Sequence, residues 1–364
     1  FDRIVMDKTL SNQVIPPLHT IIKKVNLNPE RNGAFRLLLN GEILAQSGTT
    51  SLPVQEYAFS IIPQPKKDMK KTFGAYISLS PQAIEIMSKA GIRKTVTLSC
   101  GNVLLEGWRW IEPEPGKFVW WDERVKLAKK YGIEIVVNLH HRFPSWAINP
   151  EEPNPLKTKK YTFSRKGWEN FVKKMVSHYR YYIKDYLIID EPYYLFTPHQ
   201  YAELLKVTYR AIKSIDPECK VIAHGGYYDY WLEELEKEGA FSFFDGISDY
   251  ARNKPQGERL KRYKEKYGKF IINAEYGNHK SIYRTIEAPD NPADRRSPSL
   301  YLKNTENLIK LVIRAMCWSG AIGFNRYDAR YPGGDFTKLD RHASMFEYDG
   351  SLKPPAVAYA IMSY

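Results

Sequence analysis

Short apolar segments alternate with amphipathic segments along most of this chain, and no other feature limits the possible folds as much. The apolar segments have the lengths and the β-branched residues typical of buried strands. There are eight of them, at residues 73–78, 93–99, 133–140, 186–190, 220–224, 244–250, 269–274 and 321–325. Segments with helical periodicity separate them, at residues 81–90, 123–131, 165–182, 198–215, 230–238, 257–267 and 300–319. This order predicts an α/β protein with a (β/α)8 TIM barrel, and a doubly wound open sheet is the alternative.

Residues typical of helix ends support these boundaries. Thr197 and Gln200 have the spacing of a capping box, and Ser164 and Asp122 are candidate N-caps. Glycines follow the last residues of several predicted helices, at Gly91, Gly132, Gly239 and Gly268. No GxGxxG or GxxxxGK[ST] motif follows any strand, so the usual phosphate-binding loop of an open nucleotide-binding sheet is missing. These features favour the barrel.

The first 65 residues differ from the rest of the chain. Apolar stretches at residues 33–39 and 57–62 are separated by turn-forming residues, including Asn40-Gly41. We therefore predict a small β-rich N-terminal appendage over residues 1–65. A proline-marked polar hinge joins it to a barrel over residues 66–364.

The charge and the lengths of the apolar runs limit the kinds of partner that the protein can bind. The 364 residues include 54 Lys and Arg against 41 Asp and Glu, a formal charge of +13. The basic residues are scattered, without a basic arm, zinc knuckle or RNP-type strand, so we predict a solvated surface and no nucleic-acid partner. The abundance of Lys also fits a heat-adapted surface. No apolar run reaches the roughly 18 residues of a membrane span, so we expect no membrane partner.

The cysteines and the chain ends bear on processing and compartment. Cys100, Cys219 and Cys317 are odd in number and far apart, which argues against a disulfide scaffold. The chain begins at Phe1 instead of Met and stops at Tyr364 within a helical pattern, so we expect trimmed ends and a truncated C-terminus. We expect a secreted or extracellular protein, and a cytoplasmic location stays open.

Two of the predicted strands end in a glutamate. Glu191 follows the apolar residues of the fourth strand, and Glu275 follows those of the seventh. Catalytic residues of barrels lie at the carboxyl ends of strands. Two carboxyl groups that face each other across a cleft are the minimum requirement for hydrolysis of a glycosidic bond. Each glutamate alone is equally compatible with a surface strand end, but the pair favours catalysis.

Residues 73–364 resemble the barrel glycoside hydrolases of clan A type, whose catalytic glutamates lie on strands 4 and 7. The sequence motifs are most similar to those of glycoside hydrolase families 39, 42 and 5. The resemblance rests on Glu191-Pro192, on Glu275 before Gly277, on the Trp-Ile-Glu-Pro-containing segment 107–120 and on residues 139–147. It implies a retaining double displacement on a β-linked glycan, with Glu191 as acid/base and Glu275 as nucleophile.

Two positions depart from the pattern of these families. They usually carry Asn before the acid/base, where its amide contacts the substrate 2-hydroxyl, whereas this chain has Asp190. An ionised Asp only accepts hydrogen bonds, so the substrate must donate, and a 2-ammonium group as in glucosamine would suit it. The families also often carry Arg near the end of strand 2, which residues 94–99 lack. Arg109 in the following loop is the candidate replacement.

Other residues near the strand ends are candidates for binding the sugar. His140 and His141 follow the third strand, where a neutral imidazole can both donate and accept hydrogen bonds. Tyr250 ends the sixth strand. At this place the resembled families often have a Tyr or His that is hydrogen-bonded to the catalytic nucleophile. Aromatic rings stack on the C–H faces of sugars. The candidate rings are Trp108, Trp146, Tyr276 and Tyr327, with Trp110, Tyr193, Tyr194, Tyr227, Tyr228 and Tyr230 in the same loops.

Two functions stay open from the sequence. The first is a retaining glycoside hydrolase acting on an oligosaccharide or polysaccharide. The second is a carbohydrate-binding barrel with impaired catalysis, suggested by Asp190 and the missing strand 2 arginine. His140, His141 and His224 show no metal-ligand spacing, so we expect neither a metal nor a cofactor. The sugar, the linkage and the choice between endo and exo action stay open.

Overall fold

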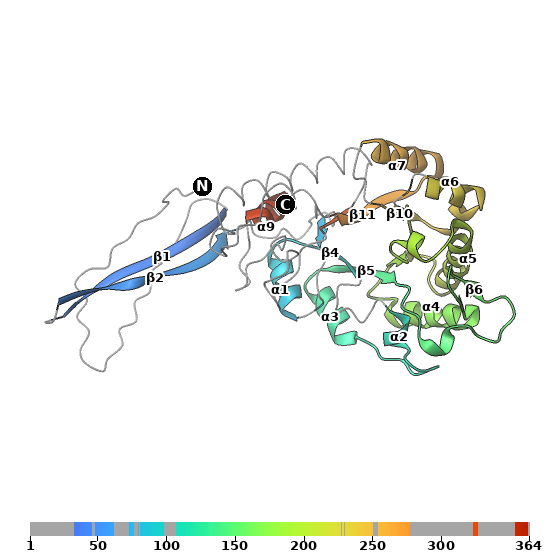
Figure 1. The fold of residues 1–364 in the computed structure, drawn as a ribbon, viewed down its shortest axis with the longest axis horizontal. Helices are drawn as coiled ribbons and strands as arrows, with labels where there is room; N and C mark the ends of the chain where they lie inside the picture. The colour runs from blue at the N-terminus through green and yellow to red at the C-terminus, as the bar shows by residue number, and fades with distance from the viewer. Residues whose placement is uncertain are drawn as a thin grey trace.

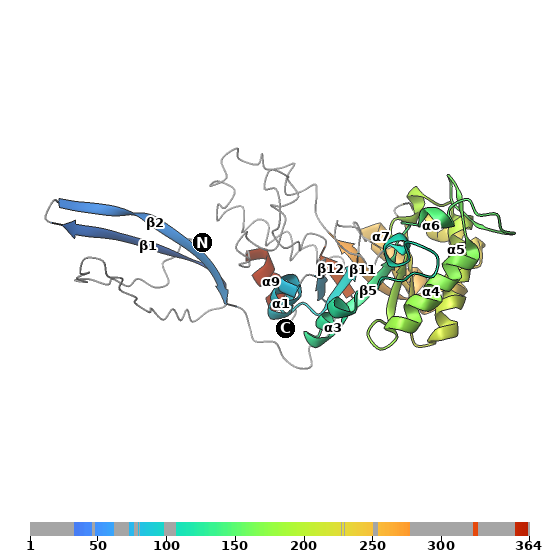
Figure 2. The ribbon, with the colours of Figure 1, turned by 90° about the horizontal axis from the view of Figure 1, so that it is seen from below.

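The computed structural model describes residues 33–45, 48–61, 73–75, 79, 81–97, 107–226, 228, 230–249, 254–276, 323–326 and 354–362. Figure 1 shows strands surrounded by helices, with a long hairpin extending to one side. Figure 2 gives the same arrangement seen from below.

Eight strands pair in parallel and close into a barrel. In chain order they are β3 (Phe73–Ala75), β4 (Lys94–Thr97), β5 (Glu134–Leu139), β8 (Asp185–Ile188), β9 (Lys220–His224), β10 (Gly246–Ser248), β11 (Phe270–Tyr276) and β12 (Gly323–Arg326). The first and last strands pair, with Phe73 opposite Phe324, which closes the ring. The prediction of a closed parallel sheet is therefore confirmed for the strands, and the open-sheet alternative is wrong.

Helices cover the outer face of the barrel (Figure 1). They are α1 (Pro81–Lys89), α2 (Trp108–Ile111), α3 (Asp122–Lys130), α4 (Arg165–Tyr179), α5 (Pro198–Ile215), α6 (Tyr230–Lys237), α7 (Lys254–Tyr267) and α9 (Pro354–Met362). The sequence analysis missed α2, which is a single turn. The helix expected at residues 300–319 lies outside the described residues, so the full set of eight β/α pairs stays a prediction.

The helix ends follow the chemistry predicted for them. The Thr197 side chain accepts from the Gln200 N–H and the Gln200 side chain accepts from the Thr197 N–H, which confirms the capping box of α5. Ser164 caps α4 by accepting from the Gly167 N–H at 2.9 Å. The N-cap predicted at Asp122 is wrong, because Asp122 is the first residue of α3 and Trp121 occupies the cap position. The four predicted helix-ending glycines all have left-handed φ angles, between 65° and 78°.

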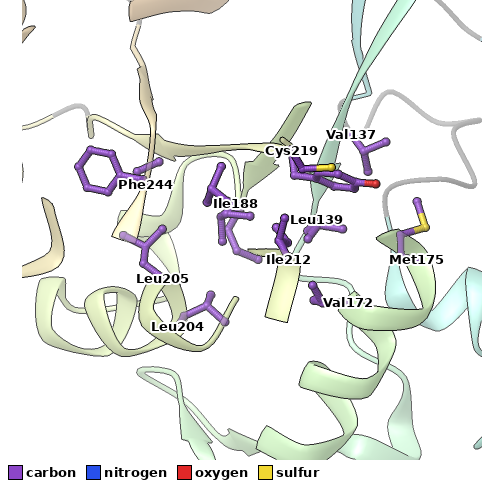
Figure 3. Packing of buried hydrophobic residues seen from close by; sticks show 14 of the residues in the cluster. Val137, Leu139, Val172, Met175, Ile188, Leu204, Leu205, Ile212, Cys219 and Phe244 are labelled. Atoms are coloured by element: carbon purple, nitrogen blue, oxygen red, sulfur yellow. The ribbon is translucent and has the colours of Figure 1, made fainter. Parts of the chain in front are cut away.

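The main core lies between the sheet and the helices. Side chains from the outward face of the strands, such as Val137 and Ile188, pack against Val172 and Met175 of α4 and Leu205 of α5 (Figure 3). The Cys219 thiol is buried in the same layer, and burial raises its pKa to about 12. This continuous layer holds the strands, and therefore the residues that follow their carboxyl ends, in one fixed arrangement.

Alternate strand residues form a second cluster inside the barrel. It consists of Val96, Val136, Leu187, Ile222 and Ile272, one from each of five strands. Because side chains alternate along a strand, the residues two positions later face the same interior at the carboxyl end. On β5 and β9 these residues are polar, Asn138 and His224, and both are buried. The interior of the barrel is therefore filled by an apolar layer, and polar groups lie next to this layer on the side of the carboxyl ends of the strands.

The N-terminal described segment is a long antiparallel hairpin of β1 (Gly33–Ala45) and β2 (Gly48–Ile61). Asn40-Gly41 does not form the turn that the sequence suggested. The strand continues through it, and the register shifts between Leu39 and Gly41 instead. The boundaries of an appendage over residues 1–65 stay a prediction. No helix among the described residues is long and apolar enough to cross a membrane.

Candidate active site

The chain turns sharply where β8 ends, and this turn positions Glu191. Ile189 and Glu191 both have left-handed backbones, with φ angles of 51° and 47°. For residues other than glycine this conformation costs on the order of 1–3 kcal/mol, and such residues cluster at functional sites. The Ile189 N–H donates to the Leu139 carbonyl at 3.3 Å, and the Asp190 N–H donates to Asn138 Oδ1 at 3.2 Å. The end of β5 therefore holds the strained turn in place.

Tyr193 orients the Glu191 carboxyl group. Its hydroxyl donates to Glu191 Oε1 at 2.8 Å from the first turn after the strand. The Tyr193 ring is buried, and burial, with the adjacent Glu191 second, raises the pKa of its phenol far above the usual range. The phenol therefore keeps its proton and acts as a permanent donor. Glu191 as a whole is half buried.

His224 faces Asp190 from the end of β9. Its Nδ1 accepts from the Gly226 N–H at 2.9 Å, so a neutral ring carries its proton on Nε2, and Nε2 lies 3.3 Å from Asp190 Oδ1. Gly226 has a φ of 78°, and a Cβ there would lie 2.4 Å from the Trp231 ring. Only glycine therefore fits the turn that sets the His224 tautomer. The Asp190 carboxylate therefore lies within ion-pair distance of a buried imidazole.

The two histidines after β5 differ in exposure. His140 is buried, and its pKa is lowered to about 3 by burial first, then by the charges of His141 and Arg142. His141 is exposed, and its ring centroid lies 3.8 Å from that of His140. Desolvation and then Arg142 lower the pKa of His141, while the negative Asp190 opposes them. His140 is therefore a neutral group next to the Asp190 turn.

Two buried polar atoms at this end of β5 have no hydrogen-bond partner among the described residues. They are Asn138 Nδ2 and His140 Nδ1. Unpaired buried polar atoms are rare in folded proteins and call for a partner such as water or a ligand. They lie beside the turn that carries Asp190 and Glu191, so they add potential hydrogen-bonding groups to the same site.

The segment that carries Trp108 and Glu112 forms a scaffold. Trp108 is fully buried, its Nε1 donates to Glu112 Oε2 at 2.7 Å, and its ring stacks on Phe171. Glu112 also accepts from the Gly116 N–H at 2.8 Å. The half-buried Trp146 packs edge-to-face on Trp108 and donates to the Glu112 carbonyl at 3.3 Å. The structure therefore corrects the prediction for Trp108, which has no exposed ring face to offer a sugar.

Arg109 lies on the exposed side of the same turn. Its guanidinium sits 4.3 Å from the centroid of the exposed Trp110 ring. The contact described for its side chain is the one with Trp110. A role in supporting the nucleophile stays a prediction.

Glu275 is the penultimate residue of β11, at the same end of the barrel as Glu191. Between Asn273 and Tyr276 the strand has one more residue than its partner β12. Bulges of this kind are frequent at barrel rims and next to active sites. The side chains of Glu275 and Tyr276 are outside the described part, as are Tyr250 and Tyr327 entirely, so their predicted roles stay predictions.

The sequence analysis missed part of this site. It weighed His224 only as a metal ligand and did not consider Asn138. The sequence did contain a signal for both residues. On two of the strands a polar residue follows an inward-facing apolar residue by two positions, Asn138 after Val136 and His224 after Ile222. Within the described segments, no group of three or more His, Cys, Asp or Glu side chains is arranged to hold a metal ion.

Comparison with known proteins shows similarity in fold. No family model and no curated protein matches the sequence. Among solved structures, a family 39 glycoside hydrolase from the gut symbiont Bacteroides cellulosilyticus WH2 matches 91% of this chain and 71% of its own, with a TM-score of 0.68 and 19% identity. A family 39 β-xylosidase from Caulobacter crescentus matches 82% and 72%, with a TM-score of 0.53 and 15% identity. A psychrophilic family 10 endo-β-1,4-xylanase matches 81% and 97%, with a TM-score of 0.57 and 12% identity.

Proposed function

We propose that this chain, whose barrel is that of the clan A glycoside hydrolases, is itself a glycoside hydrolase that cleaves a β-linked glycan with retention of configuration. The observation that carries the proposal is the strained turn at the end of β8. It fixes Glu191 at the carboxyl end of the barrel, where Glu191 accepts a hydrogen bond from Tyr193, and β11 carries a second glutamate, Glu275, next to its last residue at the same edge. The fold similarity to glycoside hydrolases supports it.

In the proposed first step, Glu275 attacks the anomeric carbon while Glu191 protonates the departing oxygen. A covalent glycosyl-enzyme forms, and the bond between sugar and leaving group breaks. Glu191 becomes negatively charged as it gives up its proton, and the 2.8 Å hydrogen bond from Tyr193 stabilises that charge. In the second step Glu191 takes a proton from water, which attacks the anomeric carbon and releases Glu275.

Asp190 and its neighbours are proposed to bind the sugar beside the broken bond. Asp190 Oδ1 lies 3.3 Å from His224 Nε2, and the Asp190 carboxylate is the proposed acceptor for a donor on the substrate. Asn138 Nδ2, His140 Nδ1 and Asp190 Oδ1 itself are buried atoms without a hydrogen-bond partner among the described residues. A hydroxyl donor or an ammonium group at the 2-position of the sugar satisfies an acceptor-only Asp190.

A carbohydrate-binding barrel without turnover is the second candidate. It is favoured by Asp190, since a carboxylate cannot donate the hydrogen bond that the usual Asn supplies. Hydrolysis of a panel of aryl β-glycosides and polysaccharides separates the two candidates. Turnover with retained configuration supports the hydrolase, whereas tight binding without turnover supports the second candidate.

Variants of the glutamates test the assigned roles. Glu275→Ala should abolish turnover. Glu191→Ala should spare the first step for substrates with good leaving groups, because such groups depart without an acid. Azide should restore turnover, because it attacks the glycosyl-enzyme without a general base. Glu265→Ala, an exposed glutamate of α7, is the matched control and should behave as wild type. Equal losses for Glu191→Ala on good and poor leaving groups would remove Glu191 from the acid role.

A further inference from the structure

Three exposed tyrosines gather beside Glu191. Tyr194 follows β8, Tyr228 follows β9, and Tyr230 is the first residue of α6. Their side chains are 68%, 46% and 51% exposed. Single exposed aromatics are ordinary on protein surfaces, but a group of them around a site marks a binding surface. We call these three residues the tyrosine platform.

The platform connects to the proposed acid/base through Tyr193. The Tyr193 ring lies 4.6 Å from that of Tyr194 and 5.6 Å from that of Tyr228, and its hydroxyl holds Glu191. Tyr228 in turn stacks on Tyr230, with centroids 5.8 Å apart and planes at 18°. Packed rings therefore run without interruption from the Glu191 carboxyl group to the surface.

Other exposed aromatic rings have a different environment. The ring of Tyr181 has Arg180 over it at 4.6 Å, and Tyr182 has Lys129 at 4.8 Å. Both tyrosines follow α4 and precede β8, so they lie at the opposite end of the barrel. The platform differs because its rings pack on one another at the end that carries Glu191. Tyrosine rings offer an apolar face and a hydroxyl rim, which suit the C–H face and the hydroxyl edge of a sugar ring.

We propose that the tyrosine platform binds a sugar unit on the leaving-group side of the scissile bond, which makes the protein selective for chains over single sugars. The inference rests on the proposed function, because it takes Glu191 as the acid. An acid catalyst contacts the departing oxygen, so the unit attached to that oxygen lies next to the residues around Glu191. Tyr228 and Tyr230 are the exposed rings reached from there through Tyr193.

The test compares two substrates of the same sugar, the β-glycosyl fluoride and a β-linked oligosaccharide. Fluoride is a leaving group without a ring, so it cannot use the platform. Tyr228→Ala and Tyr230→Ala should each lower kcat/KM on the oligosaccharide about three- to tenfold, as expected for one lost stacking contact. Their kcat/KM on the fluoride should equal that of wild type. Tyr228→Phe keeps the ring and should retain most of the oligosaccharide activity.

Tyr181→Ala is the matched control, an exposed tyrosine at the other end of the barrel, and should leave both activities unchanged. Unchanged oligosaccharide activity in the platform variants overturns the proposal, and so does an equal loss on both substrates. If wild type hydrolyses neither substrate, the proposed function fails, and calorimetry with the oligosaccharide then tests the platform alone. Weaker binding by Tyr228→Ala and Tyr230→Ala than by wild type would then support it, and equal binding would overturn it.

Discussion

Removing the Tyr193 hydroxyl tests whether this residue orients the acid. In Tyr193→Phe the ring keeps its packing against Tyr194, Tyr228 and Trp231, and only the 2.8 Å hydrogen bond to Glu191 Oε1 is lost. A hydrogen bond to a charged group contributes about 1.5–3 kcal/mol, or about 10- to 150-fold in rate. Water can partly replace the hydroxyl, because Glu191 is only half buried. We therefore expect a loss near the lower end, about tenfold.

The assay is kcat/KM on aryl glycosides whose leaving groups differ in acidity. Because Tyr193 stabilises the charge that forms on Glu191 as it gives up its proton, the loss should appear on poor leaving groups and vanish on good ones. Tyr179→Phe is the matched control: it removes a buried hydroxyl that bonds the Trp121 N–H in the helical layer, and should lower thermal stability without affecting either substrate class. An equal loss for Tyr193→Phe on all leaving groups would refute a role through Glu191.

Three further predictions concern charge and stability. Asp190→Asn should keep or raise kcat/KM on neutral β-glycosides and lower it on 2-ammonium sugars by about 10- to 150-fold, since it removes a charged hydrogen bond; identical rates on both substrates would show that Asp190 does not face the sugar. Glu112→Ala leaves the buried Trp108 Nε1 without its acceptor, at about 1–3 kcal/mol, and urea unfolding should show that loss; unaltered stability would contradict the scaffold role. The pKa of His140 is lowered from 6.5 to about 3, so below pH 6.5 the unfolded chain binds a proton that the folded chain does not. Stability should therefore fall as pH drops from 6.5 towards 3, by up to about 1.4 kcal/mol per pH unit, and unfolding at pH 7 and 5 should show a smaller difference in His140→Phe than in wild type.

The elements of the barrel could be predicted because their signals are local. Short apolar segments identified the strands and a period of 3.6 residues identified the helices. The Thr197 capping box and the Ser164 cap marked where α5 and α4 begin. The turn of the hairpin was predicted less well. Asn40-Gly41 has the sequence of a tight turn, but the pairing of β1 with β2 continues through it with a shift in register. Pairing along two long strands outweighed a local turn preference.

The site could be predicted only in part, because its geometry depends on contacts between strands. Glu191 was identified from its place after an apolar strand. The left-handed backbone of Ile189 and Glu191, however, depends on hydrogen bonds that this turn donates to Leu139 and Asn138. The tautomer of His224 depends on a glycine turn that packs against Trp231.

Trp108 was predicted wrongly. Because it lies in a recognisable motif, the sequence analysis expected its ring to bind the sugar. The sequence alone does not distinguish a tryptophan near a strand end that binds a sugar from one that packs in the core. The buried Glu112 partner decides between the two, and only the fold reveals that partner. In this structure, the segment that carries the resemblance forms a scaffold.

Covalent labelling tests the central claim most directly. A 2-fluoro glycoside with a good leaving group forms a stable glycosyl-enzyme when a retaining nucleophile is present, and mass spectrometry of the digested protein locates the modified residue. The account predicts one label per chain, on the peptide that contains Glu275, and faster labelling in wild type than in Glu191→Ala when the leaving group is poor. A label on another residue, or turnover with inversion and no label, would contradict it.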